Sequence, residues 1–142
     1  MAFLGRFDYT LDAKNRLTIP ARFRASLAEG LVLAKGTAPC MAVWTPRGFA
    51  DYVERAVEGM HPLSPEREQI VRFLTSSAFE VNLDAAGRVM VPPDLLGYAG
   101  LKKDVVVAGV DVRLEVWDRD RWAQQQEELD ITKLTARFSS LP

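Results

Sequence analysis

The strongest constraint on the fold is a short stretch that the chain contains twice. Residues 11–20 return 72 residues later as residues 83–92, and the Asp, the Arg and the Pro of the first copy are matched by Asp84, Arg88 and Pro92. Such an internal duplication indicates that the two halves of the chain share one supersecondary unit. Any fold assigned to this chain must therefore hold two copies of that unit.

Each copy is predicted to be a β-hairpin with a tight polar loop. Apolar residues alternate with polar ones before the shared Asp and again after the shared Arg, which is the period of a half-buried strand. The loop between these runs ends in Asn15 or Gly87, two residue types that readily adopt positive φ. Pro20 and Pro92 are expected to end the returning strand before a short helix.

The shared Asp and Arg each allow two interpretations. Asp12 and Asp84 suit a structural role, in which the carboxylate accepts loop N–H groups or contacts the Arg four residues later. Arg16 and Arg88 either close the hairpin through that contact or face a ligand. The ligand-facing role is favoured for Arg16 by its basic neighbours in the sequence, which are Arg6, Lys14, Arg22 and Arg24.

Charge is distributed unevenly between the two copies. The formal net charge of the 142-residue chain is -1, which by itself does not indicate a nucleic-acid partner. Residues 1–24, however, carry five basic and two acidic side chains, whereas residues 79–98 carry one basic and three acidic ones. Attraction for a polyanion is therefore expected mainly at the first copy.

The paired motif resembles that of a known family. The stretches Asp-x-Lys-x-Arg-Leu-x-Ile-Pro and Asp-x-x-Gly-Arg-Val-x-Val-Pro closely resemble the MraZ family of bacterial transcriptional regulators, and each half is similar to an AbrB/SpoVT swapped-hairpin DNA-binding unit. The resemblance runs from Phe3 to about Trp122. The first copy departs from the family pattern at Asn15, where Gly is usual, but Asn tolerates the left-handed conformation better than other non-Gly residues.

The resemblance implies an α+β, β-rich fold in which two tandem AbrB/SpoVT-like swapped-hairpin units form one pseudo-twofold β-barrel with flanking helices. We expect the first unit over residues 5–49, a helical connection over 50–77, the second unit over 78–122 and a C-terminal helix or tail over 123–142. The family also implies a homo-oligomer, a ring of several subunits. Such a ring would bind repeated promoter boxes of its own division and cell-wall gene cluster and typically repress it, in the cytoplasm at the nucleoid.

The candidate site residues follow from the motif and its neighbours. DNA contacts are assigned to Arg16, Lys14, Arg88, Arg22, Arg24 and Arg6. A structural role in the hairpin loops is assigned to Asp12, Asn15, Asp84 and Gly87. The expected partner is double-stranded DNA carrying promoter repeats, without a cofactor or a metal.

Periodicity and capping residues place the other elements. A short helix is predicted over residues 21–28, with Phe23 and Leu27 inward and Arg22 and Arg24 outward. Strands follow at 31–34 and 41–44, and helices open after Thr45 and Ser64. The second copy repeats this order, with a short helix at 95–98, strands at 104–108 and 113–117, and a helix capped by Asp118. From Asp130 the periodicity fades, and the tail to Pro142 is expected to be a frayed helix or disordered.

Several classes of protein are excluded. One cysteine, Cys40, excludes an intramolecular disulfide and a cysteine zinc cluster, and its apolar neighbours predict a buried thiol. One histidine, His61, supplies neither a catalytic relay nor a histidine metal site. No nucleotide-binding glycine loop, signal peptide or apolar run of the ~20 residues needed to span a membrane is found. The three tryptophans suit packing better than base stacking. A soluble, cytosolic protein without a small-molecule substrate is expected.

Two functions from different classes remain. In the first, the hairpins and the helices that follow them present Arg and Lys to a DNA groove. In the alternative, the chain is an AbrB-like assembly module whose arginines serve contacts with other subunits or a protein partner. An acid/base enzyme using Asp12 and Asp84 is rejected because the sequence supplies neither a pocket nor a second type of catalytic group. A gel shift that disappears with added salt would separate the first two.

Overall fold

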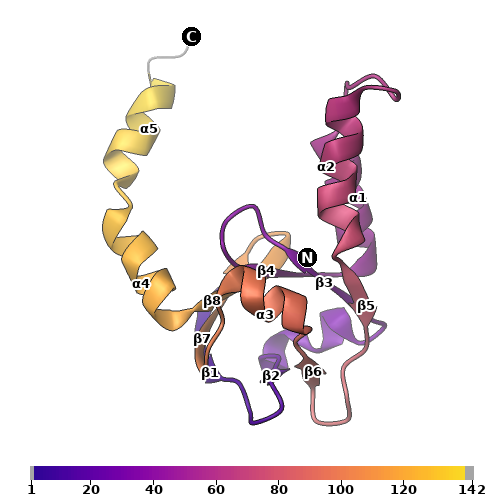
Figure 1. The fold of residues 1–142 in the computed structure, drawn as a ribbon. Helices are drawn as coiled ribbons and strands as arrows, with labels where there is room; N and C mark the ends of the chain where they lie inside the picture. The colour runs from indigo at the N-terminus through magenta and orange to yellow at the C-terminus, as the bar shows by residue number, and fades with distance from the viewer. Residues whose placement is uncertain (1, 140–142) are drawn as a thin grey trace.

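The computed structural model describes residues 2–139, and the part of the predicted tail at 140–142 lies outside the described residues (Figure 1). The first repeat contributes the strands β1 (Arg6–Thr10), β2 (Arg16–Thr18), β3 (Leu31–Lys35) and β4 (Met41–Trp44). The second contributes β5 (Phe79–Val81), β6 (Arg88–Met90), β7 (Asp104–Val110) and β8 (Arg113–Asp118). The predicted strands at 31–34, 41–44, 104–108 and 113–117 are thus confirmed.

The strands form two sheets that share one symmetry. The larger sheet has six strands in the order β1-β7-β8-β4-β3-β5, and β2 pairs with β6 in a separate ribbon. All pairs are antiparallel. The counterparts in the two repeats are β1 and β5, β2 and β6, β3 and β7, and β4 and β8. When every strand of the larger sheet is exchanged for its counterpart, the same order is obtained, read from the opposite edge. A pseudo-twofold axis therefore passes between β4 and β8 and between β2 and β6.

The repeats exchange strands across this axis. Phe7 of β1 pairs with Val107 of β7, and Phe79 of β5 pairs with Leu33 of β3. The prediction that β1 and β2 pair within one hairpin is therefore wrong, although a tight loop does join them. Alternation of apolar and polar residues determines which face of a strand is buried but not which strand becomes its partner.

The expected closed barrel is not formed by the described strands. β1 and β5 are the two edges of an open sheet, and β2 and β6 pair only with each other. The ribbon is extended by two bonds between the repeats: the Ile19 N–H donates to the Gly87 carbonyl at 2.9 Å, and the Val91 N–H donates to the Asn15 carbonyl at 2.9 Å. Because β2 uses its hydrogen-bonding groups on β6, it does not close the sheet onto β1.

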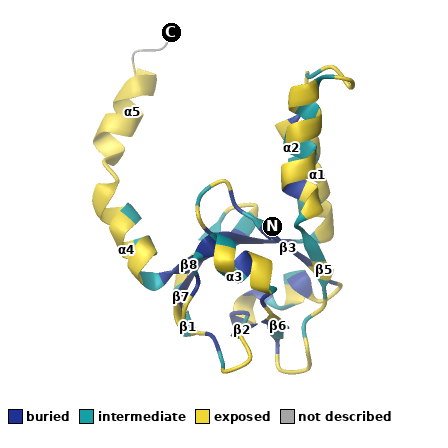
Figure 2. Ribbon diagram, viewed as in Figure 1, coloured by how far each residue is buried: buried dark blue, intermediate teal, exposed yellow. Residues whose placement is uncertain are grey.

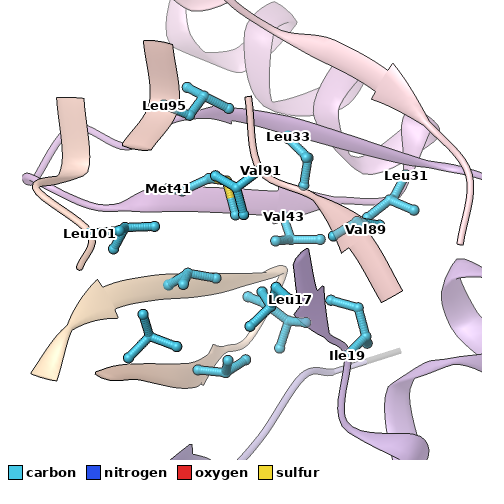
Figure 3. Packing of buried hydrophobic residues seen from close by; sticks show 14 of the residues in the cluster. Leu17, Ile19, Leu31, Leu33, Met41, Val43, Val89, Val91, Leu95 and Leu101 are labelled. Atoms are coloured by element: carbon cyan, nitrogen blue, oxygen red, sulfur yellow. The ribbon is translucent and has the colours of Figure 1, made fainter. Parts of the chain in front are cut away.

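The main core lies between the ribbon and the larger sheet (Figure 3). Leu17 and Val89, which face each other in the ribbon, are 0% and 3% exposed. They point toward Leu33 and Val43 of the larger sheet, both fully buried. Burying such a side chain contributes roughly 1.5 to 3 kcal/mol, so this cluster fixes the ribbon against the sheet.

Two helices project from one side of the sheet as a hairpin (Figure 1). They are α1 (Pro46–Ala56) and α2 (Pro65–Ser76). The predicted caps are confirmed, since the Thr45 hydroxyl accepts the Gly48 N–H at 2.9 Å and the Ser64 hydroxyl accepts the Arg67 N–H at 3.0 Å. Trp44 stacks on Tyr52 of α1 with ring centroids 4.5 Å apart, which is the predicted packing role.

The helices that follow the two loops differ. In the second repeat this segment is α3 (Pro93–Ala99), as predicted. In the first repeat the predicted helix over 21–28 consists of two 3-10 turns, η1 (Ala21–Phe23) and η2 (Ala25–Leu27). Phe23 and Leu27 are buried, in agreement with the prediction.

A helical arm leaves the sheet on the side opposite the α1–α2 hairpin (Figure 1). It consists of α4 (Arg119–Glu128), capped by Asp118 as predicted, and α5 (Ile131–Ser139). Trp122 of α4 packs against Trp117 with ring centroids 5.8 Å apart. Among the described residues, every helix is too short or too polar to cross a membrane.

Candidate nucleic-acid interface

The loops of the two repeats lie side by side at one end of the molecule. Figure 1 shows the β1–β2 and β5–β6 loops at the end away from the α1–α2 hairpin and the helical arm. Pairing of β2 with β6 brings them together, because Arg16 lies opposite Met90 and Thr18 lies opposite Arg88. The loop tips are exposed (Figure 2), whereas Leu17 and Val89 of the ribbon are buried and Met90 of the ribbon is exposed.

Asp12 organises the first loop. Its Oδ1 accepts the N–H groups of Lys14 and Arg16 at 2.9 Å and 2.8 Å, and its Oδ2 accepts Nε of Arg16 at 2.6 Å. One carboxylate oxygen thus satisfies the loop backbone while the other holds the guanidinium. Asp12 therefore makes both structural contacts expected from the sequence, the one with the loop N–H groups and the one with the Arg four residues later.

Asp84 repeats this arrangement in the second loop. Its Oδ1 accepts the N–H groups of Ala86 and Arg88, both at 2.9 Å, and its Oδ2 accepts Nε of Arg88 at 2.9 Å. Two loops with different sequences between Asp and Arg therefore have the same hydrogen bonds. The shared Asp and Arg thus make the same contacts in both loops.

These hydrogen bonds shift the acidity of both carboxylates. The N–H of Arg16 lowers the pKa of Asp12 below its ordinary value, and desolvation partly opposes this effect. The N–H of Arg88 lowers the pKa of Asp84 in the same way, again partly opposed by desolvation. Both groups are thus ionised at neutral pH, which the loop requires.

The last loop residue before each Arg has positive φ, namely 57° at Asn15 and 76° at Gly87. The two positions differ in what surrounds them. A Cβ added at Gly87 would meet the guanidinium of Arg24, which packs directly against this glycine. Nε of Arg24 donates to the Ile19 carbonyl at 2.9 Å. Arg24 is therefore half-buried beneath the second loop rather than directed outward as predicted.

The two motif arginines approach the same carboxylate oxygen, Oδ2 of Asp12. The Arg16 and Arg88 side chains are 30% and 33% exposed, and Nη1 of Arg88 lies 3.9 Å from Oδ2 of Asp12 in the other repeat. Each Nε is engaged by its own Asp. Within residues 2–139 the contact of Arg16 with Asp12 is made by Nε, which leaves its Nη groups available as donors.

The other predicted residues lie at different distances from this pair. Lys14 is exposed at the tip of the first loop. Arg22 lies over the rings of Phe7 and Phe23, 5.9 Å and 5.7 Å from their centroids. Arg6 begins β1, at the end of that strand remote from the loop, and contacts Asp8 at 3.5 Å. The structure therefore does not bring Arg6 to the loop pair.

Two lysines that the sequence analysis did not assign lie beside the first loop. The Leu11 N–H donates to the carbonyl of Lys103 at 2.8 Å, and a surface hollow of about 590 Å³ lies between the loop and the segment before β7. Lys102 and Lys103, both exposed, line this hollow together with Asp12 and Asn15. In the sequence they appear only as a Lys-Lys pair directly before a strand. Their position beside the first loop follows from the pairing of β7 with β1.

Comparison with known proteins gives one consistent result. The chain matches the family described as "MraZ protein, putative antitoxin-like" over residues 2–68 and again over 74–140. It is 34% identical over 140 residues to a transcriptional regulator MraZ of Clostridium acetobutylicum, which covers 98% of both chains. It is 40% identical over 126 residues to a transcriptional regulator MraZ of Moorella thermoacetica, covering 89% of this chain and 87% of that protein.

Proposed function

Since this chain belongs to the MraZ family, we propose that it is a transcriptional regulator that binds double-stranded DNA through the end formed by its two loops. Its named relatives are regulators and not enzymes. We assign the DNA contacts to Arg16, Lys14, Arg88, Arg22 and Arg24, with Arg6 as a peripheral contact. Asp12, Asn15, Asp84 and Gly87 maintain the loops.

The convergence of Arg16 and Arg88 on one exposed ribbon carries this proposal. A two-stranded ribbon fits the major groove, which is about 12 Å wide, and an arginine there can donate two hydrogen bonds to a guanine edge. The contact of each Nε with an Asp fixes the guanidinium before DNA arrives. Less side-chain entropy is then lost on binding.

Phosphate contacts would come from the lysines around the first loop. Lys14 and the Lys102–Lys103 pair surround that loop, whereas the tip of the second loop has Ala85 and Ala86 instead. Salt-dependent attraction to DNA is therefore concentrated around the first loop, and the second loop contributes mainly Arg88.

At the level of the cell, we propose that the chain represses its own division and cell-wall gene cluster from repeated promoter boxes, in the cytoplasm at the nucleoid. It would act as a ring-shaped homo-oligomer, and the contacts of adjacent subunits would add up on spaced boxes. We further propose that the domains follow the repeats, with AbrB/SpoVT-like units at 5–49 and 78–122, a helical connection at 50–77 and a C-terminal helix or tail at 123–142.

A gel shift tests this function directly. DNA from upstream of the chain's own gene should be retarded at 50 mM salt and released at 200 mM, because each phosphate contact contributes a slope of about -0.9 to the logarithmic salt dependence. A scrambled duplex of the same composition should bind more weakly at every salt concentration. Equal retardation of both duplexes, or none at low salt, would refute the proposal.

A second candidate function is favoured by one contact. Arg88 reaches Asp12 of the other repeat at 3.9 Å, so this motif arginine also joins the two halves. In this alternative the chain is an assembly module whose arginines serve subunit or protein contacts. Arg16→Ala would then change the mass of the assembly in light scattering, whereas in the DNA-binding account it leaves the mass unchanged and weakens DNA binding.

A further inference from the structure

Arg119, the first residue of α4, connects the start of that helix to both strands at one edge of the larger sheet. Its Nη2 donates to the carbonyl of Tyr9 in β1 at 3.0 Å and to the carbonyl of Val105 in β7 at 3.4 Å. Its Nη1 lies 3.9 Å from Oδ1 of Asp104, the first residue of β7. Tyr9 and Val105 face each other in the β1–β7 pair, so one guanidinium contacts both strands at the same point.

This contact lies at the base of the first loop, where β1 leads into it. Tyr9 comes three residues before Asp12, whose carboxylate organises the loop. The N–H of Leu11, between them, donates to the carbonyl of Lys103, which directly precedes β7. Arg119 therefore holds together the two segments from which the first loop and its neighbouring lysines emerge.

The same place beside the second loop is occupied by a proline. Thr45 and Asp118 are matching helix caps in the two repeats, so the counterpart of Arg119 is Pro46. A proline side chain offers no hydrogen-bond donor. The first residue of the helix therefore cannot hold the base of the second loop in the way that Arg119 holds the first.

The acidic partner has an uncharged counterpart as well. In the pairing of β5 with β3, the position equivalent to Asp104 is that of Gly30. A Cβ added at Gly30 would lie 3.7 Å from the carbonyl oxygen of Val81 and 4.0 Å from Cγ of Pro46. A proline and a glycine thus lie together at one edge of the sheet where the other edge has an ion pair. The pseudo-twofold symmetry is broken at the base of the loops.

Stability alone does not account for this arginine. Within residues 2–139, Nε of Arg119 is buried and has no hydrogen-bond partner. A buried donor without a partner opposes folding. Moreover, β1 pairs with β7 over five residue pairs, so the edge of the sheet is held by other bonds. What the contact adds is a fixed geometry at the point where β1 enters the first loop.

We propose that Arg119 is a positioning residue for DNA binding. By holding Tyr9 against Val105 it fixes the base of the first loop, and through Asp12 it fixes the direction of the Arg16 guanidinium. A loop that is already ordered loses less conformational freedom on binding. This inference rests on the proposed function, in which Arg16 contacts the DNA, and it adds a residue that acts only through the protein.

Anisotropy titrations with a duplex carrying a single promoter box test the assignment with two variants. Arg119→Met removes the donors and should weaken binding about 2- to 10-fold, the scale of ordering one side chain on association. Arg121→Met removes the same charge from an exposed position of the same helix and should bind like wild type. Equal losses in the two variants, or wild-type affinity of Arg119→Met, would overturn the proposal.

A double-mutant cycle shows whether Arg119 acts through the first loop. In the Arg16→Ala background, Arg119→Met should cost little further affinity, because the side chain that it positions is gone. In the Arg88→Ala background it should cost as much as in wild type. A contact that only maintains the fold would reduce binding by the same factor in both backgrounds, and that result would also overturn the proposal.

Each titration is done at a temperature at which circular dichroism shows the variant to be folded. If Arg119→Met does not fold, Arg119→Lys takes its place in the cycle, since lysine keeps the charge but lacks the planar fork. Its loss should be smaller and should depend on Arg16 in the same way.

The outcomes separate this inference from the proposed function. A wild type that does not bind the promoter duplex would refute the proposed function and the role of Arg119 together. A wild type that binds it specifically, with independent losses at Arg119 and Arg16, would overturn the role of Arg119 and leave the proposed function intact.

Discussion

Arg16 and Arg88 have the same hydrogen bonds in two loops with different surroundings. Arg16 follows a loop with Lys14 at its tip and the Lys102–Lys103 pair at its side. Arg88 follows a loop whose tip is two alanines. The two arginines therefore allow a comparison between positions with the same hydrogen bonds and a different neighbouring charge, in which Arg88 makes one further contact, to Asp12.

We expect Arg16→Ala to weaken specific DNA binding more than Arg88→Ala does. Loss of a bidentate base contact corresponds to ~1 to 3 kcal/mol, or roughly 5- to 150-fold in affinity. Fluorescence anisotropy titrations on folded protein of unchanged mass provide the measurement. Arg47→Ala, which removes an exposed arginine of α1, is the control and should bind like wild type. Equal losses at Arg16 and Arg88 would show that both loops engage the DNA equally.

Asp12 and Asp84 should make stability depend on acid pH. Because folding lowers both pKa values, their contribution is fully present above the unfolded pKa of about 3.9 and is lost as the pH falls through the folded values. Asp12→Ala with Asp84→Ala should therefore lower the melting temperature at pH 7. Its difference from wild type should shrink below about pH 4. A difference that is constant from pH 7 to pH 3 would show that the carboxylate charge is irrelevant to the loop.

At the scale of elements, the second loop is fixed by a glycine that the first loop does not need. Gly87→Ala places a side chain at φ 76° and against the guanidinium of Arg24. We expect a loss of about 1 to 2 kcal/mol from the left-handed backbone alone. Asn15→Gly, in an exposed tip at φ 57°, should leave stability nearly unchanged. Urea unfolding measures both, and a Gly87→Ala variant as stable as wild type would contradict the role given to this glycine.

Local elements were predictable because their signals are local. Thr45, Ser64 and Asp118 cap helices as expected, since a side-chain acceptor followed by a helical period needs no tertiary information. Asn15 and Gly87 adopt positive φ for reasons contained within the loop. The repeat itself identified the two units, which share one order of elements.

Pairing between elements was not predictable from the residue pattern alone, because both repeats offer nearly the same strands. The alternation around Phe7 would let β1 pair with a strand of its own repeat or with β7 of the other repeat. Only the whole fold selects β7, where Phe7 lies opposite Val107. Arg24 was predicted outward from a helical period, but the segment forms 3-10 turns and the side chain lies under Gly87. Lys102 and Lys103 were missed for the same reason, since exchange of β1 brings them to the first loop.

At the scale of the whole molecule, the two loops and the projecting helices lie at different ends. The loops project at one end, while the α1–α2 hairpin and α5 extend from the other (Figure 1). A ring built through the helices would therefore leave the loop ends of its subunits free. Multivalent binding to DNA then needs only the loop contacts that a single subunit makes, repeated by the other subunits.

This arrangement predicts a strong dependence on the number and spacing of boxes. A duplex with two boxes at the native spacing should bind the oligomer ~100-fold more tightly than a duplex with one box. Insertion of half a helical turn between the boxes should abolish most of that gain, since the second loop end then meets the wrong side of the DNA. A gain that survives the insertion would argue against a rigid ring.

The face that meets DNA can be located by site-directed photocrosslinking. Cys40 is fully buried, and burial raises the pKa of its thiol to about 12, so a thiol-reactive crosslinker should attach to an introduced exposed cysteine instead. The account predicts that Ala13→Cys and Ala85→Cys, at the two loop tips, both crosslink to promoter duplex, with the stronger yield from position 13. Leu63→Cys, 79% exposed between α1 and α2, should give none. Crosslinks from position 63 with none from either loop would contradict the assignment of DNA binding to the paired loops.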